Sequence, residues 1–487
     1  MLFAGRALVA LVLVSGSLSA QSPALDGAVR AMGGKERILA VRTLVLEGRG
    51  ENLNFGQNHT PFAESKFEVT SFRRAYDFRN RRWFQDQTRV PRFNTANVNP
   101  QRQRTGLDGA GGGVAYNVLP NDAMTRASDQ VAADRAHEFV LHPIGFAQAA
   151  YAPGSEVSEA PASGEMRRVR LTAGGATYSM YVDPRTSLPV RMERVVYQPM
   201  LGDVTMAVEL SDWRAVSGVQ LPMRLTQKYD DLFTLADITV ATAQVNADVG
   251  NIAATDSIRS VVVQAGQPAA PTIAIDSIAP GVWSVAGQSH HTIVIEQSGQ
   301  LVLVEAPQSE ARTLAAIAAA RALRPDKPAN VLVNTHHHFD HSGGLRAAIS
   351  QGFTIVTHEG NRDFYERVLF PRRHAIQQDR LGQNPKPMRL MPVPDRYVRA
   401  DSVRPVEVYA VPSDHSGSML VVYLPNERIL IQADLYNPPA PNAVNPVFPF
   451  AKALVENVQR RGLAVDRVVG IHGRPVPWSD VVAAAQR

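Results

Sequence analysis

Histidine and aspartate are concentrated in one short stretch of the chain. Four of the thirteen histidines and one aspartate fall between His336 and His341, in the sequence Thr-His-His-His-Phe-Asp-His-Ser-Gly-Gly that begins at Thr335. Imidazole nitrogens and carboxylate oxygens are common ligands of zinc in proteins. Each buried imidazole needs partners for two ring nitrogens, so packing alone does not explain such a cluster. The stretch therefore predicts a metal site.

The elements around this stretch predict how it is positioned. The apolar run Val331–Val333 precedes it, and a segment with helical character begins at Leu345. We therefore expect a strand to deliver the histidines onto a loop that leads into a helix. Three further residues with metal-binding types of side chain, His415, Asp434 and His472, each come shortly after a predicted strand.

The spacing T-H-x-H-x-D-H-x-G-G, followed in order by those three residues, resembles the metallo-β-lactamase superfamily of metallohydrolases. The resemblance covers residues 273–487 and implies a four-layer αβ/βα sandwich there. It also implies two zinc ions, with iron or manganese as alternatives because the ligand types do not separate these metals. The implied ligands are His336, His338 and His415 for the first zinc, Asp340, His341 and His472 for the second, and Asp434 as a bridge between them.

The local geometry of the stretch agrees with this implied ligand set. Side chains at positions 336 and 338 project to the same side of an extended segment, whereas Asp340 and His341 follow the turn and can face a second ion. His337 and Phe339 are expected to point away. Two metal ions about 3.5–4 Å apart can share a hydroxide, which would attack an ester-, lactone-, thioester- or amide-like bond of a small-molecule substrate. Asp340 would be the catalytic residue that orients this hydroxide and accepts a proton.

Five other residues are candidates for supporting the site or contacting the substrate. Glu305 ends a predicted strand where the superfamily often carries an aspartate that supports the ligands. His291 and His358 lie in predicted loops and could line the pocket, and a structural or solvated role is the alternative for each. Tyr436 and Asn437 directly follow the proposed bridging aspartate and are candidates for substrate contact.

The N-terminus has the pattern of a secretory signal peptide. Arg6 provides a positive charge, Ala7–Val14 is apolar, and small residues precede a cleavage site near Ala20. The apolar run is too short to span a bilayer. We therefore predict removal of residues 1–20, a periplasmic or secreted location, and no transmembrane anchor.

A β-rich domain is predicted from residue 21 to residue 250. Alternating apolar and polar residues separated by turn signals predict a curved antiparallel sheet, with a loop over Asn94–Gly113 and mainly helix over Ala123–Ala150. The turn phrases Asp183–Arg191 and Val216–Arg224 resemble those of exported lipoprotein-carrier-like half-barrels, whose concave face could hold an apolar ligand. The alternative is a domain that shapes or covers a neighbouring site. A linker is predicted over residues 251–272, which places the hydrolase domain at 273–487.

Composition excludes several classes of site. The chain has no cysteine, so disulfides, thiolate metal ligands and cysteine nucleophiles are absent. A net charge of +5 is small for 487 residues, and no nucleic-acid partner is expected. Two other functions stay open: an envelope ligand carrier or assembly factor with a structural metal domain, and a mononuclear iron oxygenase on the same scaffold. The sequence leaves the oligomeric state undetermined.

Overall fold

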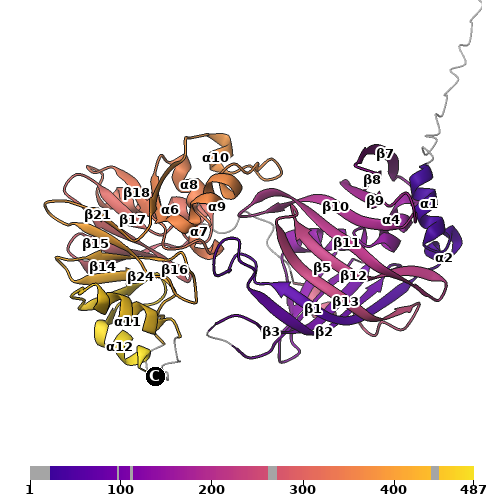
Figure 1. The fold of residues 1–487 in the computed structure, drawn as a ribbon, viewed down its shortest axis with the longest axis horizontal. Coiled ribbons are helices and arrows are strands. Elements are labelled where there is room, and N and C mark those ends of the chain that lie inside the picture. The colour runs from indigo at the N-terminus through magenta and orange to yellow at the C-terminus, as the bar shows by residue number, and fades with distance from the viewer. Residues whose placement is uncertain (1–21, 96–97, 110–112, 262–270, 440–448, 487) are drawn as a thin grey trace, which may run out of the picture.

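The computed structural model describes residues 22–95, 98–109, 113–261, 271–439 and 449–486. An N-terminal part is built on one large sheet, and a C-terminal part is built on two smaller sheets (Figure 1). The predicted signal peptide lies outside the described residues, as do residues 262–270 of the predicted linker. Among the described residues, no helix is both long and apolar enough to cross a membrane.

The N-terminal part is an antiparallel sheet of thirteen strands. Its first strand pairs with its last, so the chain returns to the middle of the sheet before it leaves this part. In their order across the sheet the strands are β6 (Met124–Arg126), β5 (Val114–Val118), β4 (Gln101–Asp108), β3 (Arg82–Pro91), β2 (Lys66–Asp77), β1 (Thr43–Leu53), β13 (Phe233–Val245), β12 (Val219–Tyr229), β11 (Gly202–Val216), β10 (Pro189–Gln198), β9 (Ala176–Val182), β8 (Met166–Ala173) and β7 (Glu156–Ser163).

Short helices pack against this sheet. They are α1 (Pro23–Ala31), α2 (Lys35–Leu39), α3 (Asp129–Ala136), the 3₁₀-helix η2 (His137–Phe139) and α4 (Pro143–Ala150). The hydroxyl of Ser22 accepts a hydrogen bond from the Leu25 N–H and caps α1. Apolar residues of α1 and α4, among them Leu25 and Phe146, join Leu44 of β1 in one buried core. The β-rich antiparallel domain predicted from the sequence is confirmed.

Two local predictions in this part are wrong. Residues 101–108, predicted as loop, form β4, and residues 124–126, predicted as helix, form the edge strand β6. The sequence of β4 lacks apolar alternation because its side chains pair with polar groups on the neighbouring strand. Arg102 donates to both carboxylate oxygens of Asp86, at 3.0 and 2.6 Å, and Gln87 donates to Gln103 at 2.8 Å.

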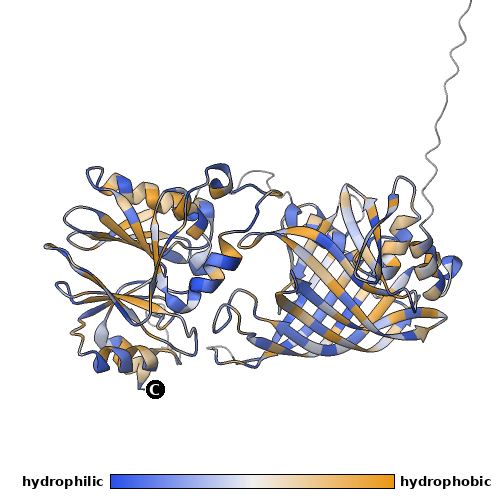
Figure 2. Cartoon of the chain, turned by 45° about the horizontal axis from the view of Figure 1, so that its top comes forward, coloured by the Kyte–Doolittle hydropathy of each residue, from blue (hydrophilic) through white to orange (hydrophobic). Residues whose placement is uncertain are grey.

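The C-terminal part contains a seven-stranded sheet and a six-stranded sheet. Figure 2 shows that the strands of these sheets are mainly hydrophobic, whereas hydrophilic and hydrophobic residues alternate along the N-terminal strands. The first sheet holds β14 (Ala274–Ala279), β15 (Val282–Gly287), β16 (His290–Glu296), β17 (Leu301–Val304), β18 (Ala329–Val333), β19 (Thr354–His358) and β20 (Arg389–Val393). The second holds β21 (Arg396–Arg399), β22 (Val406–Ala410), β23 (Leu420–Leu424), β24 (Ile429–Gln432), β25 (Arg467–Gly470) and β26 (Val476–Pro477).

Helices cover the outer faces of the two sheets (Figure 1). Apolar residues of both sheets, such as Val302 and Val422, form the core between them. Ile317 of α6 (Glu310–Leu323) packs on the outer face of the first sheet, and Leu454 of α11 (Ala451–Arg460) packs on the outer face of the second. The predicted four-layer αβ/βα sandwich is confirmed. The helices are α6 (Glu310–Leu323), α7 (Phe339–Ser342), α8 (Leu345–Ser350), η3 (Glu359–Asn361), α9 (Arg362–Phe364), η4 (Tyr365–Leu369), α10 (Arg380–Gln383), α11 (Ala451–Arg460) and α12 (Trp478–Ala485).

The predicted linker begins with an ordered segment. A short helix, α5 (Asp256–Arg259), lies within it, and Ala254 and Ile258 pack against Val114 and Tyr116 of β5. The start of this segment therefore packs with the N-terminal sheet.

Candidate metal centre

Four of the candidate ligands follow parallel strands of the two C-terminal sheets, namely His336, His338, Asp434 and His472. His415 follows the antiparallel strand β22, and Asp340 and His341 lie in α7. In the first sheet β17, β18 and β19 run parallel, and in the second sheet β24 and β25 do. The carboxyl ends of parallel strands meet at one edge of a sheet. Glu305 and the histidine stretch therefore lie near each other, as do Asp434 and His472, although each pair is distant in sequence.

Eight side chains form two groups whose ligand atoms converge. Within each group the candidate atoms all lie within 4.8 Å of one another. The first group is His336, His338, His415 and Asp434, and the second is His290, Asp340, His341 and His472. All seven residues that the sequence analysis assigned to metal binding are brought together in this way.

Asp434 lies between the two groups. Its Oδ2 is 3.0 Å from His415 Nε2 and 2.9 Å from His341 Nε2, and its Oδ1 is 2.8 Å from His472 Nε2. Burial opposes the charge of this carboxylate, but the imidazoles of His341, His336 and His415 outweigh burial and hold the pKa of Asp434 well below its usual range. The carboxylate is thus ionised between two sets of nitrogens.

Most of the histidine rings are oriented by a hydrogen bond on the side away from the cluster. The Nδ1–H of His341 donates to Glu305 Oε2 at 3.0 Å, that of His336 donates to Thr335 Oγ1 at 3.0 Å, and that of His472 donates to the Ser289 carbonyl at 2.9 Å. A neutral imidazole, the form that binds metal, carries one N–H, so in that form these bonds leave each Nε2 lone pair facing inward. This is the usual orientation of a metal-binding histidine.

His338 is oriented the other way round. Its Nε2–H donates to the Asn58 carbonyl at 2.9 Å, which leaves Nδ1 as the nitrogen with the lone pair. This Nδ1 is buried and has no hydrogen-bond partner among the residues that the structure describes. A buried nitrogen without a partner is costly in a metal-free protein, and it is the atom that faces the other members of the first group.

The donor set fits divalent metal ions. Nε2 of His336 lies 3.3 Å from Nε2 of His415, and Nε2 of His341 lies 3.3 Å from Nε2 of His472. Inward lone pairs at these distances repel each other unless a proton or a cation lies between them. Imidazole nitrogens and carboxylate oxygens are ligands of zinc, iron and manganese. The described residues therefore form a candidate His/Asp metal centre.

Glu305, a candidate for supporting the ligands, lies beside the histidine cluster. It is completely buried, and its carboxylate accepts hydrogen bonds from the Thr335 hydroxyl at 2.5 Å and from His341. Its backbone has a φ of 83°, a conformation that non-glycine residues rarely adopt. Asn334, which the sequence analysis did not single out, joins Glu305 to the main chain by donating to Glu305 and to the carbonyl of His336.

His290 is the ligand-group member that sequence reasoning missed. The adjacent His290 and His291 begin β16, and alternation along a strand sends them to opposite faces. Nε2 of His290 lies 3.2 Å from Asp340 Oδ2, whereas His291 hydrogen-bonds the Ser284 hydroxyl away from the cluster. The signal was present as a histidine pair at the start of a strand, but the face of each residue depends on strand pairing.

The remaining candidates lie outside the two groups. His358 accepts a hydrogen bond from the Gly360 N–H and caps η3, and burial lowers its pKa. Tyr436 is buried in the core beneath the second sheet. Asn437 is half-buried and belongs to neither ligand group. His337 points away from the cluster, as expected, and hydrogen-bonds the Ser418 hydroxyl.

The pKa values of two members of the second group are shifted in opposite directions. Burial alone would lower the pKa of His341, but the carboxylates of Asp434 and Glu305 outweigh burial and raise it well above its usual value. Burial alone would raise the pKa of Asp340, but the His290 hydrogen bond and the charge of His341 hold it below its usual range.

The N-terminal sheet holds a separate cavity of about 140 Å³. Its lining mixes apolar side chains such as Phe72 and Met206 with the polar groups of Arg74, Glu138 and Gln227. The apolar ligand that we expected in this sheet stays a prediction.

Comparison with known proteins identifies the family that part of this chain matches. The family described as the metallo-beta-lactamase superfamily matches residues 286–441, which include every predicted ligand except His472. No curated protein matches the sequence.

Similar solved structures include metallo-beta-lactamases from Pontibacter korlensis, Hirschia baltica and Pseudomonas aeruginosa, the last being FIM-1 in its mono-zinc form. They are 21%, 19% and 18% identical to this chain and each has a TM-score of 0.34. The alignments cover 44%, 44% and 45% of this chain and 98%, 96% and 96% of those chains. By its match to the family, its four-layer sandwich and its histidine motif, the C-terminal part of this chain belongs to the metallo-beta-lactamase superfamily.

Proposed function

We propose that this chain is a hydrolase that uses two metal ions held at the candidate centre. The observation that carries the proposal is the position of Asp434, whose carboxylate lies within 3.0 Å of histidines of both groups. Oδ2 faces His415 and His341, and Oδ1 faces His472. A carboxylate in this position can bridge two ions, and paired ions are a recurrent device of hydrolases.

The proposed ligands are seven of the eight side chains in the two groups, and His290 is the hydrogen-bond partner of Asp340. His336, His338 and His415 would hold one ion, Asp340, His341 and His472 would hold the other, and Asp434 would contact both. We propose zinc because nitrogen and oxygen donors suit it, and iron or manganese fit the same donors. When bound, such ions lower the pKa of water enough to supply a nucleophile near neutral pH and polarise the bond under attack.

Asp340 has the position of a proton-handling group. Its low pKa keeps the carboxylate ionised at neutral pH, so it can accept a proton from the attacking water. Its side chain is 38% exposed, whereas the His341 side chain is completely buried. A small-molecule substrate can therefore reach Asp340 from solvent. His290 donates to this carboxylate and would hold its Oδ2 toward the second group.

We propose an ester-, lactone-, thioester- or amide-like bond as the target, and export through the N-terminal segment as the route to the site of action. The bridging position of Asp434 supports a two-metal hydrolase rather than an oxygenase with one iron. Histidine and aspartate ligands complete both groups, which supports a catalytic rather than a purely structural metal domain.

The test is a metal analysis coupled to a substrate panel. Purified full-length protein would be assayed against esters, lactones, thioesters, amides, cephalosporins and phosphodiesters, before and after treatment with a chelator. We expect two metal equivalents, turnover of one class of bond, loss of turnover with the chelator, and recovery on adding zinc. Folded protein without bound metal, or turnover that the chelator leaves unchanged, would contradict the proposal. Bound iron with oxygen uptake would indicate the oxygenase instead.

A further inference from the structure

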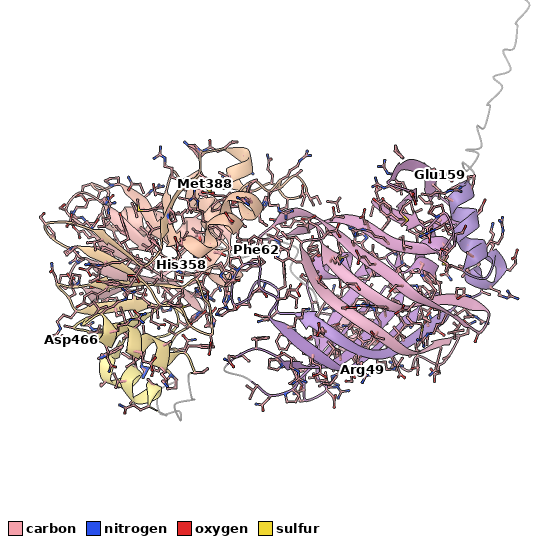
Figure 3. All side chains as sticks on the ribbon, in the orientation of Figure 1. Arg49, Phe62, Glu159, His358, Met388 and Asp466 are labelled. Carbon is pink, nitrogen blue, oxygen red and sulfur yellow. The ribbon has the colours of Figure 1, made fainter. Side chains whose placement is uncertain are left out.

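The loop between β1 and β2, residues 54–65, extends from the N-terminal sheet to the C-terminal part. Figure 3 shows Phe62, a residue of this loop, between the two parts of the molecule. The Phe62 ring makes an edge contact with Phe364 of α9. The loop also has internal hydrogen bonds, from the Asn54 N–H to the Ser65 carbonyl and from the Gln57 N–H to the Asn54 carbonyl. It is therefore a structured element of the interface.

Three consecutive residues of this loop bond to three consecutive residues of the histidine motif. The Phe339 N–H donates to the Gly56 carbonyl at 3.0 Å. Gln57 Nε2 donates to Asp340 Oδ1 at 2.6 Å. The third bond, described above, joins Nε2 of His338 to the Asn58 carbonyl. Two of the three motif residues are proposed metal ligands, one in each group.

The fit between loop and motif is close. Gly56 has a φ of +78°, and a methyl group at this position would lie 2.5 Å from the Phe339 ring. Phe55 makes an edge contact with the same ring, with centroids 5.1 Å apart. On the other side of the loop, the Gly417 N–H donates to the His59 carbonyl at 2.8 Å. Position 56 therefore requires glycine for both conformation and space.

The Asn58 carbonyl determines which nitrogen of His338 can bind a metal. Because Nε2 carries the proton that this carbonyl accepts, Nδ1 keeps its lone pair toward the first group. Asn58 is 3% exposed, so solvent does not compete for this bond. Without the loop, His338 would have no fixed acceptor from the described residues of the C-terminal part.

Gln57 orients Asp340, the proposed ligand in the second group. Oδ1 of the Asp340 carboxylate accepts a hydrogen bond from the Gln57 amide, and Oδ2 accepts one from His290. His341 Nε2 lies 3.7 Å from Oδ2. The amide thus fixes the rotation of the carboxylate and directs Oδ2 to the second group. A carboxylate with one oxygen free would lose this orientation.

A second contact holds the two parts together at a distance from the loop. The Asp203 N–H donates to the Arg373 carbonyl at 2.8 Å, and the Asp203 carboxylate accepts from the Ala375 N–H at 2.8 Å. Arg372 pairs with Asp230 beside it. The loop is thus presented to the motif by an interface with more than one point of attachment.

We propose that the N-terminal domain is a working component of the metal centre, with Gln57 as a positioning residue for Asp340 and the Asn58 carbonyl as the orienting acceptor of His338. This inference rests on the proposed two-metal site and extends it to a second domain. It assigns the N-terminal sheet a role in presenting the β1–β2 loop.

The test follows stepwise binding of Co²⁺ to metal-free full-length protein by its visible absorption. In Gln57→Ala we expect the affinity of the site built on Asp340, His341 and His472 to fall by roughly 10–100-fold, the range for loss of an outer hydrogen-bond partner. The absorption of the other site should be unchanged. Glu64→Gln is the matched control, because Glu64 lies in the same loop, is exposed, and pairs only with Lys66 among the described residues. It should bind Co²⁺ as the wild type does.

Gly56→Ala tests the loop as a whole. The added methyl group should move the loop away from Phe339, so both Co²⁺ sites should weaken and the His338 site should change its absorption. Thermal unfolding of each metal-free variant shows whether it is folded before metal is added. If the wild type binds two Co²⁺ ions and Gln57→Ala and Gly56→Ala bind them with unchanged affinity and absorption, the inference is wrong and the proposed function stands. If the wild type binds no metal, both are wrong.

Discussion

Glu305 and His341 are both completely buried, and the Nδ1–H of His341 donates to Oε2 of Glu305 at 3.0 Å. The other ring nitrogen of His341 faces Asp434 at 2.9 Å. The His341 imidazole therefore connects the Glu305 carboxylate to the Asp434 carboxylate. A ligand held in this way has little freedom to rotate out of position.

Removing the Glu305 carboxylate should lower both the stability of the protein and the metal affinity of the centre. Glu305→Ala would leave the Thr335 hydroxyl and His341 Nδ1–H without their buried acceptor, at a cost of about 1–3 kcal/mol in unfolding free energy. Metal affinity should fall by about 10–100-fold because the ring of His341 is no longer oriented. Glu305→Gln, which keeps one acceptor oxygen, should lie between wild type and Glu305→Ala. Denaturant unfolding and competitive chelator titration measure the two effects, and unchanged metal affinity in Glu305→Ala would count against this role.

His290 and His291 offer a matched pair of substitutions. His290→Gln should weaken metal binding at the second group and lower turnover, because Asp340 loses the partner that faces its Oδ2. His291→Gln should leave both nearly unchanged, because His291 bonds to Ser284 away from the cluster. Metal titration and initial rates of the two variants compare neighbouring residues of the same type on one strand. Equal effects of the two substitutions would contradict the assignment.

His142 should make the stability of the N-terminal part depend on pH. Burial, with the nearby Arg74 guanidinium, lowers the pKa of His142 from 6.5 to about 3, and its Nδ1 accepts the Ile144 N–H at the start of α4. Between these pH values the unfolded chain binds a proton that the folded chain does not. The free energy of unfolding should therefore decrease as pH falls from about 6.5 toward 3, by about 1.4 kcal/mol per pH unit for this one group.

The control for this pH dependence is His142→Asn, which keeps a capping acceptor but does not titrate. Denaturant unfolding of metal-free wild type and variant between pH 4 and pH 7 gives the two slopes. We expect a shallower slope for the variant. Identical slopes would show that His142 does not remain neutral in the folded protein.

The residues that converge at the candidate centre could be named from sequence because the resemblance rests on local motifs. Each ligand follows a strand within a few residues, and the spacing around His336 and Asp340 fixes which side chains share a face. A layered α/β domain followed from strands that alternate with helices, and the resemblance to the superfamily implied the four-layer sandwich. Glu305 was recognisable for the same reason, since it ends a strand.

Features that depend on pairing between distant segments could not be predicted. The polar side chains of strand β4 pair with residues of the neighbouring strand, as Arg102 does with Asp86. These partners are adjacent only once the sheet has formed. His290 was overlooked because strand register decides which of two adjacent histidines faces the centre. Gln57 contacts Asp340 across 283 positions of sequence, and nothing in the loop itself indicates that contact.

The most direct test of the central claim is the metal content of the wild type and of Asp434→Ala, measured on the same folded, full-length protein. The two proposed sites share this one carboxylate. We expect two equivalents of metal and chelator-sensitive hydrolysis in the wild type, and fewer than two equivalents with loss of hydrolysis in Asp434→Ala. Two tightly bound equivalents and unchanged hydrolysis in the variant would show that Asp434 does not join two metal ions in a catalytic centre.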